Sequence, residues 1–436
     1  MTLRFGTDGV RGVALTELTP AFAAHLGRAA ATVLGPGRWL VGRDPRESSQ
    51  ELAAAVAAGL VAAGAEPVDA GMLPTPALAY LSDLLAAPAA MVTASHNPWH
   101  DNGVKVFAAG GLKLPDEVER AIEAALHGPD AADPALPGPS VGAVHGADDY
   151  VRHRVDGAVS LDGLRVVLDC ANGAMSAVAP EVFRALGADI TVIHAAPNGR
   201  NINDHCGATH TASLQSAVVE AGAALGLAFD GDGDRVIAVD HLGQVVDGDR
   251  LIALAALQLH EQGALRHGTV VVTVMSNLGF HRAMDAAGIR VVTTAVGDRY
   301  VLEALDAGGY SVGGEQSGHI IYRDLATTGD GLLAGLRLAE FVHRHHRPLA
   351  DLAAGVMTSY PQVLVNVKVA ERHPHIAEEL AAEIAAAEAR LGGEGRVLLR
   401  ASGTEPLIRV MVEAALDDVA RSVADNLAAT VRARWA

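Results

Sequence analysis

The chain has 436 residues, of which 50% are hydrophobic and 19% are charged, and its formal net charge is -18. This length is too great for one ordinary core and predicts several domains, while the composition excludes a disordered chain. The acidic balance argues against nucleic acid as the main partner, and it means that an anionic substrate needs a local positive site.

Membrane and secretory roles are not expected. The longest apolar stretch, residues 52–65, is too short to span a bilayer, and the N-terminus has charged residues but no apolar signal segment. Cys170 and Cys206 are too few for a disulfide framework and lack metal-site spacing. We therefore expect a cytoplasmic protein with no membrane partner.

One local pattern occurs three times along the chain. A helical run ends at Gly64, Gly187 or Gly288, and a β-branched, strand-like segment follows each time. The spacing between copies is about the size of one α/β domain. Three similar α/β domains are therefore expected, although a helix-glycine-strand pattern alone is common in α/β proteins.

Composition suggests where the domains end. Residues 128–147 are rich in Pro, Gly and Ala and are typical of a linker, and a helix from about Asp148 leads to a strand at 164–170. A turn at 242–248 precedes an amphipathic run that opens a third domain. After Gly355, an alternating strand, an Ala/Glu helix and two further strands suggest a smaller α+β domain. The predicted strands and helix cover 363–369, 376–390, 396–400 and 407–414, and the predicted domains are 1–147, 148–247, 248–357 and 358–436.

The first motifs with possible chemistry lie in the N-terminal third. Residues 6–12 (GTDGVRG) are ambiguous in isolation. In Thr93-Ala-Ser95-His96-Asn-Pro, Ser95 could be a nucleophile, but no G-x-S-x-G turn is present and a capped turn explains the segment equally well. His96 is adjacent to Ser95 and is expected to point away from it. Lys105, at the start of a following strand, could approach the same loop, or its segment could merely be the end of a hairpin.

An aspartate cluster is the sharpest motif. Asp230, Asp232 and Asp234 alternate with glycines between two strand-like segments. In extended backbone these three side chains project to one side, where they repel one another unless a cation neutralises them. Oxygen ligands of this kind suit Mg²⁺. An EF-hand is excluded, because its Gly and Glu positions hold Arg235 and His241; a solvated acidic turn is the remaining alternative.

Two later motifs could bind a substrate. In Gly313-Gly-Glu315-Gln-Ser317-Gly-His319, Glu315 and Ser317 could bond neighbouring sugar hydroxyls, although a glycine-rich turn explains this segment equally well. In residues 400–409 (RASGTEPLIR), backbone N–H groups between two arginines can form an anion-binding nest. This second segment could supply the positive site that the acidic chain otherwise lacks, and a plain Ser-Gly-Thr turn flanked by surface arginines is the alternative.

Together and in this order, the motifs resemble those of the α-D-phosphohexomutases, from GTDGVRG at residue 6 to RASGTEPLIRVMVEA ending at residue 414. The resemblance covers nearly the whole chain. It implies an α/β protein with three related α/β domains, containing mixed sheets, and a smaller C-terminal α+β domain around a central cleft.

The resemblance also implies residue roles. Ser95 matches the phosphoserine, and its phosphate together with Asp230, Asp232 and Asp234 would bind one Mg²⁺ per chain. Lys105 is the implied general acid/base, with Arg11 and His96 also among the catalytic residues. The implied substrate-binding residues are Arg235, Glu315, Ser317 and His319, with Arg400, Ser402, Gly403, Thr404 and Arg409 for the non-reacting phosphate.

Three details resemble the family branch that interconverts glucosamine 6-phosphate and glucosamine 1-phosphate, on the way to UDP-N-acetylglucosamine. They are Gln316, where glucose and mannose mutases usually carry Met, and the segments 296–301 (VGDRYV) and 326–331 (ATTGDG). The implied intermediate and primer is glucosamine 1,6-bisphosphate or another sugar bisphosphate. The expected partner is a small phosphosugar, and the chain is expected to be a monomer or homodimer. Alternatives are a phosphoglucomutase or phosphomannomutase, a magnesium-dependent phosphatase and a non-catalytic phosphosugar-binding protein.

Overall fold

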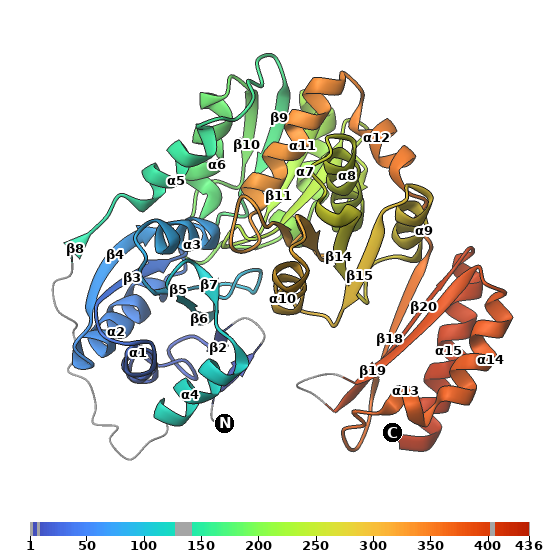
Figure 1. Ribbon diagram of the computed structural model, residues 1–436, viewed down its shortest axis with the longest axis horizontal. Coiled ribbons are helices and arrows are strands. Elements are labelled where there is room, and N and C mark those ends of the chain that lie inside the picture. Colours follow the sequence, from blue (N-terminus) through green and yellow to red (C-terminus); the bar gives the residue numbers. More distant parts are fainter. Residues whose placement is uncertain (1–2, 7–8, 127–141, 402–405, 436) are drawn as a thin grey trace. The chain divides into compact units, whose positions relative to one another are not determined.

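The structure is a computed structural model that describes residues 3–6, 9–126, 142–401 and 406–435 (Figure 1). It forms two compact units. The N-terminal unit contains Met1–Met275 and Ile289–Ala354, and the C-terminal unit contains Ser276–Gly288 and Gly355–Ala436. Among the described residues, none of the helices has the length and apolar character needed to cross a bilayer.

The first sheet of the N-terminal unit is mixed. Its order is β1-β2-β6-β5-β3-β4-β8, with β7 paired to β6. Strands β3, β4, β5 and β8 are parallel neighbours, whereas β6 is antiparallel to β5 and β2. The strands are β1 Phe5–Gly6, β2 Gly9–Val13, β3 Arg38–Arg43, β4 Glu66–Met72, β5 Ala89–Val92, β6 Asp101–Ala108, β7 Leu112–Lys113 and β8 Gly142–Ala143.

Two further mixed sheets follow along the chain. Their orders are β10-β9-β11-β12-β13 and β15-β14-β16-β17. The second sheet has β9 Arg165–Asp169, β10 Asp189–Ile193, β11 Leu225–Phe229, β12 Val236–Asp240 and β13 Val245–Val246. The third sheet has β14 Thr269–Thr273, β15 Arg290–Thr294, β16 Val312–Gly314 and β17 Ile320–Tyr322.

All three sheets contain the same four-strand order. The sets β4-β3-β5-β6, β10-β9-β11-β12 and β15-β14-β16-β17 each have three parallel strands and then an antiparallel fourth. The connection between the third and fourth strands contains residues 93–100, 230–235 or 315–319. These segments hold the serine, aspartate and Glu315 motifs, so one topological position carries a candidate functional loop three times.

The three repeated glycines confirm the predicted repeat. Gly64, Gly187 and Gly288 have φ values of +80°, +86° and +69°, the left-handed conformation that glycine tolerates after a helix. Each stands between a helix and the first strand of the shared order, which is β4, β10 or β15. The expectation of three related α/β domains with mixed sheets is therefore confirmed.

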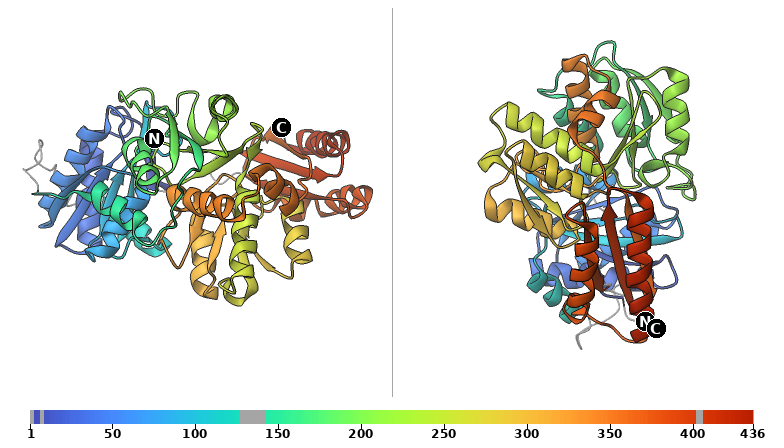
Figure 2. Two further views of the ribbon diagram at one scale, coloured as in Figure 1. Left: turned by 90° about the horizontal axis from the view of Figure 1, so that it is seen from above. Right: turned by 90° about the vertical axis from the view of Figure 1, so that its right-hand side faces the viewer.

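Helices cover the faces of these sheets (Figures 1 and 2). Helix α8 begins where the sequence predicts, because the Asp247 side chain accepts a hydrogen bond from the Arg250 N–H and caps the first turn. The helices are α1 Pro20–Leu34, α2 Ser49–Ala62, α3 Thr75–Leu84, α4 Asp116–Leu126, α5 Gly146–Val155, α6 Met175–Ala185, α7 Ala212–Ala221, α8 Gly248–Glu261, α10 Asp298–Gly308, α11 Gly331–His345 and α12 Leu349–Val356, with 3₁₀ turns at Gly207–Thr209 and Arg266–Gly268.

The predicted linker at 128–147 lies mostly outside the described residues. Its described end is not a linker, because β8 begins at Gly142 and α5 begins at Gly146. Strand β8 pairs with β4 and extends the first sheet. This end of the segment is therefore ordered by pairing with a strand far earlier in the chain.

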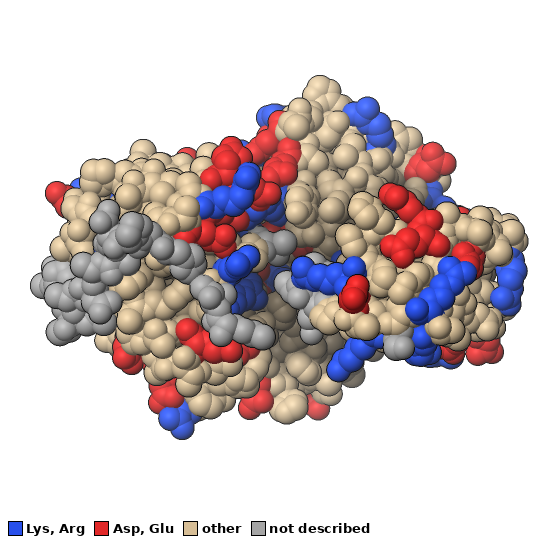
Figure 3. Space-filling model, turned by 90° about the horizontal axis from the view of Figure 1, so that it is seen from below, with Lys and Arg blue, Asp and Glu red and all other residues tan. Residues whose placement is uncertain are grey.

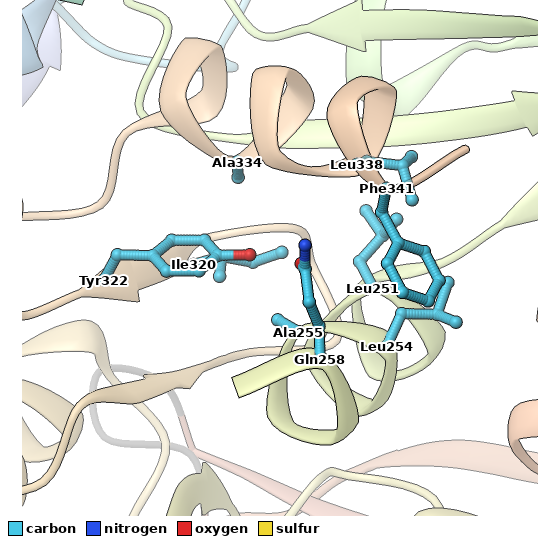
Figure 4. A pocket seen from close by; sticks show the side chains of 9 residues that line it. All are labelled: Leu251, Leu254, Ala255, Gln258, Ile320, Tyr322, Ala334, Leu338 and Phe341. Carbon is cyan, nitrogen blue, oxygen red and sulfur yellow. The ribbon is translucent and has the colours of Figure 1, made fainter. Parts of the chain in front are cut away.

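A small pocket lies between α8 and α11 beside β17 (Figure 4). Its lining is mainly aliphatic and aromatic, with one amide at Gln258, and its volume is about 10 Å³. A space of this size holds about one water molecule at most. It is a packing gap in the third sheet's helical layer and is too small for a substrate.

The C-terminal unit has the predicted α+β character. Its antiparallel sheet has the order β18-β20-β19, and Figures 1 and 2 show helices packed on one face of it. The predicted helix at 376–390 is divided at Leu380, whose φ is -115°. The elements are α9 Leu278–Ala286, β18 Gln362–Lys368, α13 Ile376–Glu379, α14 Ala381–Leu391, β19 Gly395–Ala401, β20 Leu407–Ala414 and α15 Asp417–Trp435.

Acidic and basic side chains are interspersed in small groups on the face shown in Figure 3. The described residues visible on this face do not form the single broad basic field typical of nucleic-acid binding.

Candidate active site

The serine loop follows β5 and places Ser95 in the interior. The Ser95 residue is 1% exposed, and its φ of +51° lies in the left-handed region, where a non-glycine residue must be held by its surroundings. The Ser95 N–H donates to Thr93 Oγ1 at 2.9 Å. The Ser95 hydroxyl donates to Asp230 Oδ2 at 2.6 Å, so the first and second sheets meet at this serine.

The three aspartates converge between β11 and β12. Their carboxylates are buried, and one oxygen from each lies within 4.8 Å of the others. The convergence is as predicted, but the backbone is a tight turn rather than an extended strand, with the Gly233 N–H bonded to the Asp230 carbonyl. Gly231 is required here, since an added Cβ would lie 2.6 Å from the Ser95 carbonyl oxygen.

Burial and mutual repulsion both disfavour the charged form of Asp230 in this aspartate cluster. Burial, followed by the charges of Asp234 and Asp232, raises the pKa of Asp230 well above its usual range. Lys105 offsets part of this charge, because its Nζ lies 2.8 Å from Asp232 Oδ2 and 2.9 Å from Asp234 Oδ2. Thr75 Oγ1 donates to the same Asp232 oxygen at 2.6 Å.

The residues present fit a divalent metal ion. Asp232 Oδ1 is buried and has no hydrogen-bond partner among the described residues. A buried acceptor without a partner destabilises the folded protein unless a hydrogen-bond donor or a cation binds to it. Three clustered carboxylates, one of them with this open oxygen, form the hard oxygen donor set that Mg²⁺ prefers.

Arg11 and His96 both lie beside the serine loop. Arg11 is on β2, and its guanidinium donates to the Ala94 carbonyl at 3.3 Å. His96 Nδ1 is 3.4 Å from Ser95 Oγ, so the expectation that it points away is wrong. The reason is the left-handed backbone at Ser95, which turns adjacent side chains toward one side.

Burial lowers the pKa of His96 to about 4, with the charges of Arg235 and Arg11 adding to the effect. The folded protein therefore holds His96 neutral, while the unfolded chain takes up a proton near pH 6.5. The contribution of neutral His96 to the free energy of unfolding is therefore fully present above pH 6.5, and it is lost as the pH falls through about 4.

We expect the free energy of unfolding of metal-free, unphosphorylated protein to fall by on the order of 2 kcal/mol across this interval because of His96. Denaturant titrations at several pH values check this, and His96→Asn should flatten the dependence. His145→Gln, at a side chain that is 94% exposed, is the control and should leave the dependence unchanged. Equal slopes in the parent and His96→Asn would contradict the assignment.

The predicted sugar loop lies next to the aspartate cluster. Arg235 and His319 form an isolated antiparallel bridge between the second and third sheets. His319 Nδ1 is 3.7 Å from Asp234 Oδ1 and its Nε2 is 3.5 Å from Asp298 Oδ2. Glu315 accepts the Gly297 N–H at 3.1 Å. The loop tip is more open, since Glu315 is half-buried and Ser317 is exposed.

The C-terminal unit contains two opposed arginines. Arg400 on β19 and Arg409 on β20 are direct cross-strand partners. Burial and the charge of Arg409 lower the pKa of Arg400, and Arg409 Nε is buried without a hydrogen-bond partner among the described residues. Like charges directly opposite each other on neighbouring strands repel, and a bound anion would offset this repulsion. Ser402, Gly403 and Thr404 lie outside the described residues.

The structure adds site residues that sequence reasoning missed. Thr75 contacts Asp232, and Arg46 and Asn203 donate to backbone carbonyls of the serine loop. None of these three residues lies in a motif whose spacing predicts a catalytic or binding role. The segment 42–49 (GRDPRESS) offered the best signal, since it places an Asp-x-Arg pair directly after a buried strand.

Comparison with known proteins identifies the family. Models of the phosphoglucomutase/phosphomannomutase alpha/beta/alpha domains I, II and III match residues 2–133, 148–243 and 247–360, and the C-terminal domain of that family matches residues 364–430. A solved phosphoglucomutase/phosphomannomutase family protein from Burkholderia thailandensis is 26% identical, with a TM-score of 0.83 and coverage of 98% of this chain and 97% of the other. This chain belongs to the phosphoglucomutase/phosphomannomutase family and is an isomerase of the phosphosugar mutase type.

Two relatives that are similar in sequence have names that specify the sugar. A phosphoglucosamine mutase from Rhodococcus jostii (strain RHA1) is 54% identical over 440 residues, covering 98% of both chains. A phosphoglucosamine mutase from Frankia alni is 55% identical over 454 residues, covering 99% of both chains. The similarity therefore extends over all four domains.

Proposed function

We propose that this chain interconverts glucosamine 6-phosphate and glucosamine 1-phosphate through a phosphorylated Ser95 and glucosamine 1,6-bisphosphate. The observation that carries the mechanism is the 2.6 Å contact of Ser95 Oγ with Asp230 inside a buried aspartate cluster. The sugar assignment is supported by relatives above 50% identity that are named phosphoglucosamine mutase.

The reaction moves one phosphoryl group between two oxygens. The Oγ–phosphorus bond of phosphorylated Ser95 breaks as the free sugar hydroxyl oxygen bonds to phosphorus. Ser95 Oγ takes up a proton from the Lys105 ammonium group, and the hydroxyl proton of the sugar passes to Lys105. The bisphosphate then presents its other phosphate, and Ser95 Oγ takes it back by the reverse step. A sugar bisphosphate primer supplies the first phosphate on the serine.

The chain's own groups position these atoms and offset charge. We assign proton transfer to Lys105, while His96, held neutral by burial, lies 3.4 Å from Ser95 Oγ and can accept a hydrogen bond. Lys105 also contributes positive charge beside two buried carboxylates. Phosphoryl transfer depends mainly on such positioning and electrostatic stabilisation.

Asp230, Asp232 and Asp234, with an oxygen of the Ser95 phosphate, would hold Mg²⁺. When bound, this ion supplies the charge neutralisation that lets an anionic sugar phosphate approach an anionic enzyme phosphate. Arg235, Glu315, Ser317 and His319 are proposed to contact the substrate. Arg400 and Arg409, with the segment 402–404, are proposed to bind the phosphate that does not react.

Turnover on three substrates tests the proposal. With Mg²⁺ and a bisphosphate primer, we expect kcat/KM for glucosamine 6-phosphate to exceed the values for glucose 6-phosphate and mannose 6-phosphate by at least about tenfold, equivalent to about 1.4 kcal/mol of transition-state discrimination. Coupled assays of 1-phosphate formation measure all three.

Equal or higher kcat/KM for glucose or mannose 6-phosphate would support the phosphoglucomutase or phosphomannomutase alternative. Release of inorganic phosphate without 1-phosphate formation would support a phosphatase instead. One chain contains every residue that the proposal uses, so a monomer and a homodimer both satisfy it. We place the activity in the cytoplasm, in keeping with two free, buried cysteines.

A further inference from the structure

We propose that Arg46 and Asn203 are positioning residues that together hold the phosphoserine loop in its transfer conformation. The inference rests on the proposed function of Ser95 and adds two residues outside the motifs that defined the site. Neither side chain contacts the Ser95 hydroxyl. Both act on the loop backbone, and they do so from different sheets of the N-terminal unit.

The two side chains donate to the same pair of carbonyl oxygens. Arg46 Nη2 lies 2.9 Å from the carbonyl oxygens of both Ser95 and Asn97. Asn203 Nδ2 lies 2.9 Å from the Ser95 oxygen and 3.0 Å from the Asn97 oxygen. Each carbonyl therefore receives two donors, which fixes the orientation of the Ser95–His96 and Asn97–Pro98 peptide groups.

Arg46 is itself anchored in the interior. Its Nε donates to Asp44 Oδ2 at 2.8 Å, and both side chains of this ion pair are 0% exposed. Asp44 also accepts the Thr93 hydroxyl at 2.8 Å, and Thr93 in turn accepts the Ser95 N–H. Arg46 is therefore connected to the Ser95 carbonyl directly and to the Ser95 N–H through Asp44 and Thr93. Because these hydrogen bonds act together, a shift of Arg46 would move the whole loop.

Asn203 approaches from the second sheet. It has a left-handed φ of +57°, and its N–H donates to the Ala171 carbonyl at 2.9 Å. The contact depends on Gly231, since an added Cβ would lie 2.7 Å from Asn203 Nδ2 and 2.6 Å from the Ser95 oxygen. The loop that carries the aspartates is therefore shaped to admit this contact.

The consequence for chemistry follows from the conformation of Ser95. Its left-handed φ of +51° needs external support, and the direction of its Cα–Cβ bond sets where Oγ lies relative to Asp230. Loss of either donor removes one of the two hydrogen bonds to each carbonyl and favours rotation of the peptide, and loss of both leaves the carbonyls unsatisfied. A misplacement of about 1 Å at the reacting atom can cost about 10²-fold in rate.

The decisive variants are Asn203→Gly and Asn203→Asp. Glycine keeps the left-handed backbone without strain and removes the donor, whereas aspartate keeps the shape and points acceptor oxygens at the two carbonyls. With Mg²⁺, primer and glucosamine 6-phosphate, we expect kcat to fall at least about 30-fold for Asn203→Gly and further for Asn203→Asp, with KM changed less than about threefold.

Two matched control variants distinguish a positioning role from a general loss of structural stability. Arg200→Ala removes an exposed contact between the first two sheets, because Arg200 pairs with Glu47 and stacks over Trp99 without reaching the loop carbonyls. His205→Gly places glycine at another left-handed position, φ +51°, where the side chain is 90% exposed. Both should keep kcat within about threefold of the parent.

The parent protein must first show mutase turnover and a phosphate on Ser95 by mass spectrometry; if it shows neither, the proposed function itself fails. If the parent is active and folded Asn203→Gly keeps kcat within about threefold, the positioning role is overturned. An equal loss of kcat in Asn203→Gly and His205→Gly would also overturn it. Arg46→Lys, which keeps the charge but not the forked donors, should reproduce the loss of kcat if it folds.

Discussion

Replacing Ser95 with alanine is expected to reduce mutase turnover by at least about 10³-fold, because the proposed mechanism carries the phosphoryl group on Ser95 Oγ in both halves of the reaction. The fold should remain intact. The change removes one buried hydrogen bond, from Ser95 Oγ to Asp230, at a cost of about 1 kcal/mol. Steady-state assays with Mg²⁺ and primer measure the turnover, and thermal unfolding measures the stability.

Ser82→Ala is the matched control for this variant. Ser82 is also fully buried, and its hydroxyl donates to the Ala87 carbonyl at 2.6 Å, away from the aspartate cluster. It should lose similar stability and keep parental turnover. Mass spectrometry should find phosphate on the peptide containing Ser95 in the parent and in Ser82→Ala. A fully active Ser95→Ala protein would remove the basis of the proposed mechanism.

Lys105→Met is expected to destabilise the metal-free protein by about 3–5 kcal/mol, because it leaves two buried carboxylates without their cation. Magnesium should restore part of this loss, about 2.7 kcal/mol at a concentration 100 times its Kd. We therefore expect Mg²⁺ to raise the Tm of Lys105→Met more than that of the parent. Turnover should fall by about 10²-fold or more even with Mg²⁺, since the proposed proton-transfer group is absent.

Lys113→Met provides the comparison. Lys113 is half-buried, with 11% of its side chain exposed, and it pairs with Asp298, which lies outside the aspartate cluster. Its loss should lower the Tm without enlarging the effect of Mg²⁺. If Mg²⁺ stabilises the parent and both variants equally, Lys105 and the metal do not share the charge of the aspartates, and the site would need another assignment.

Much of the fold was predictable because it depends on local chemistry. Glycines with left-handed backbone ended the helices at Gly64, Gly187 and Gly288, and β-branched residues formed the strands that follow. The aspartate cluster was predictable for a related reason. Alternating Asp and Gly give carboxylates that must lie close together whichever compact backbone they adopt, and the structure forms a turn where a strand was expected.

The rest depends on contacts that no local pattern records. His96 lies beside Ser95 only because Ser95 has a positive φ, which a generic extended chain would not show. Asn203 is one polar residue among several in its loop, and its role depends on a carbonyl 108 positions earlier in the chain. Likewise, Lys105 was a candidate from its position, but its pairing with two carboxylates required the first and second sheets to be placed together.

The recurrence of one four-strand order has a consequence for how such an enzyme can diversify. Each copy offers the same connection, and the three copies have specialised: residues 93–100 carry the serine, 230–235 the carboxylates and 315–319 the glutamate loop. Changes at the exposed tip of the last connection, around Ser317, leave Ser95 and the aspartates untouched. With the roles proposed here, sugar selectivity can therefore change without any change in the residues that perform phosphoryl transfer.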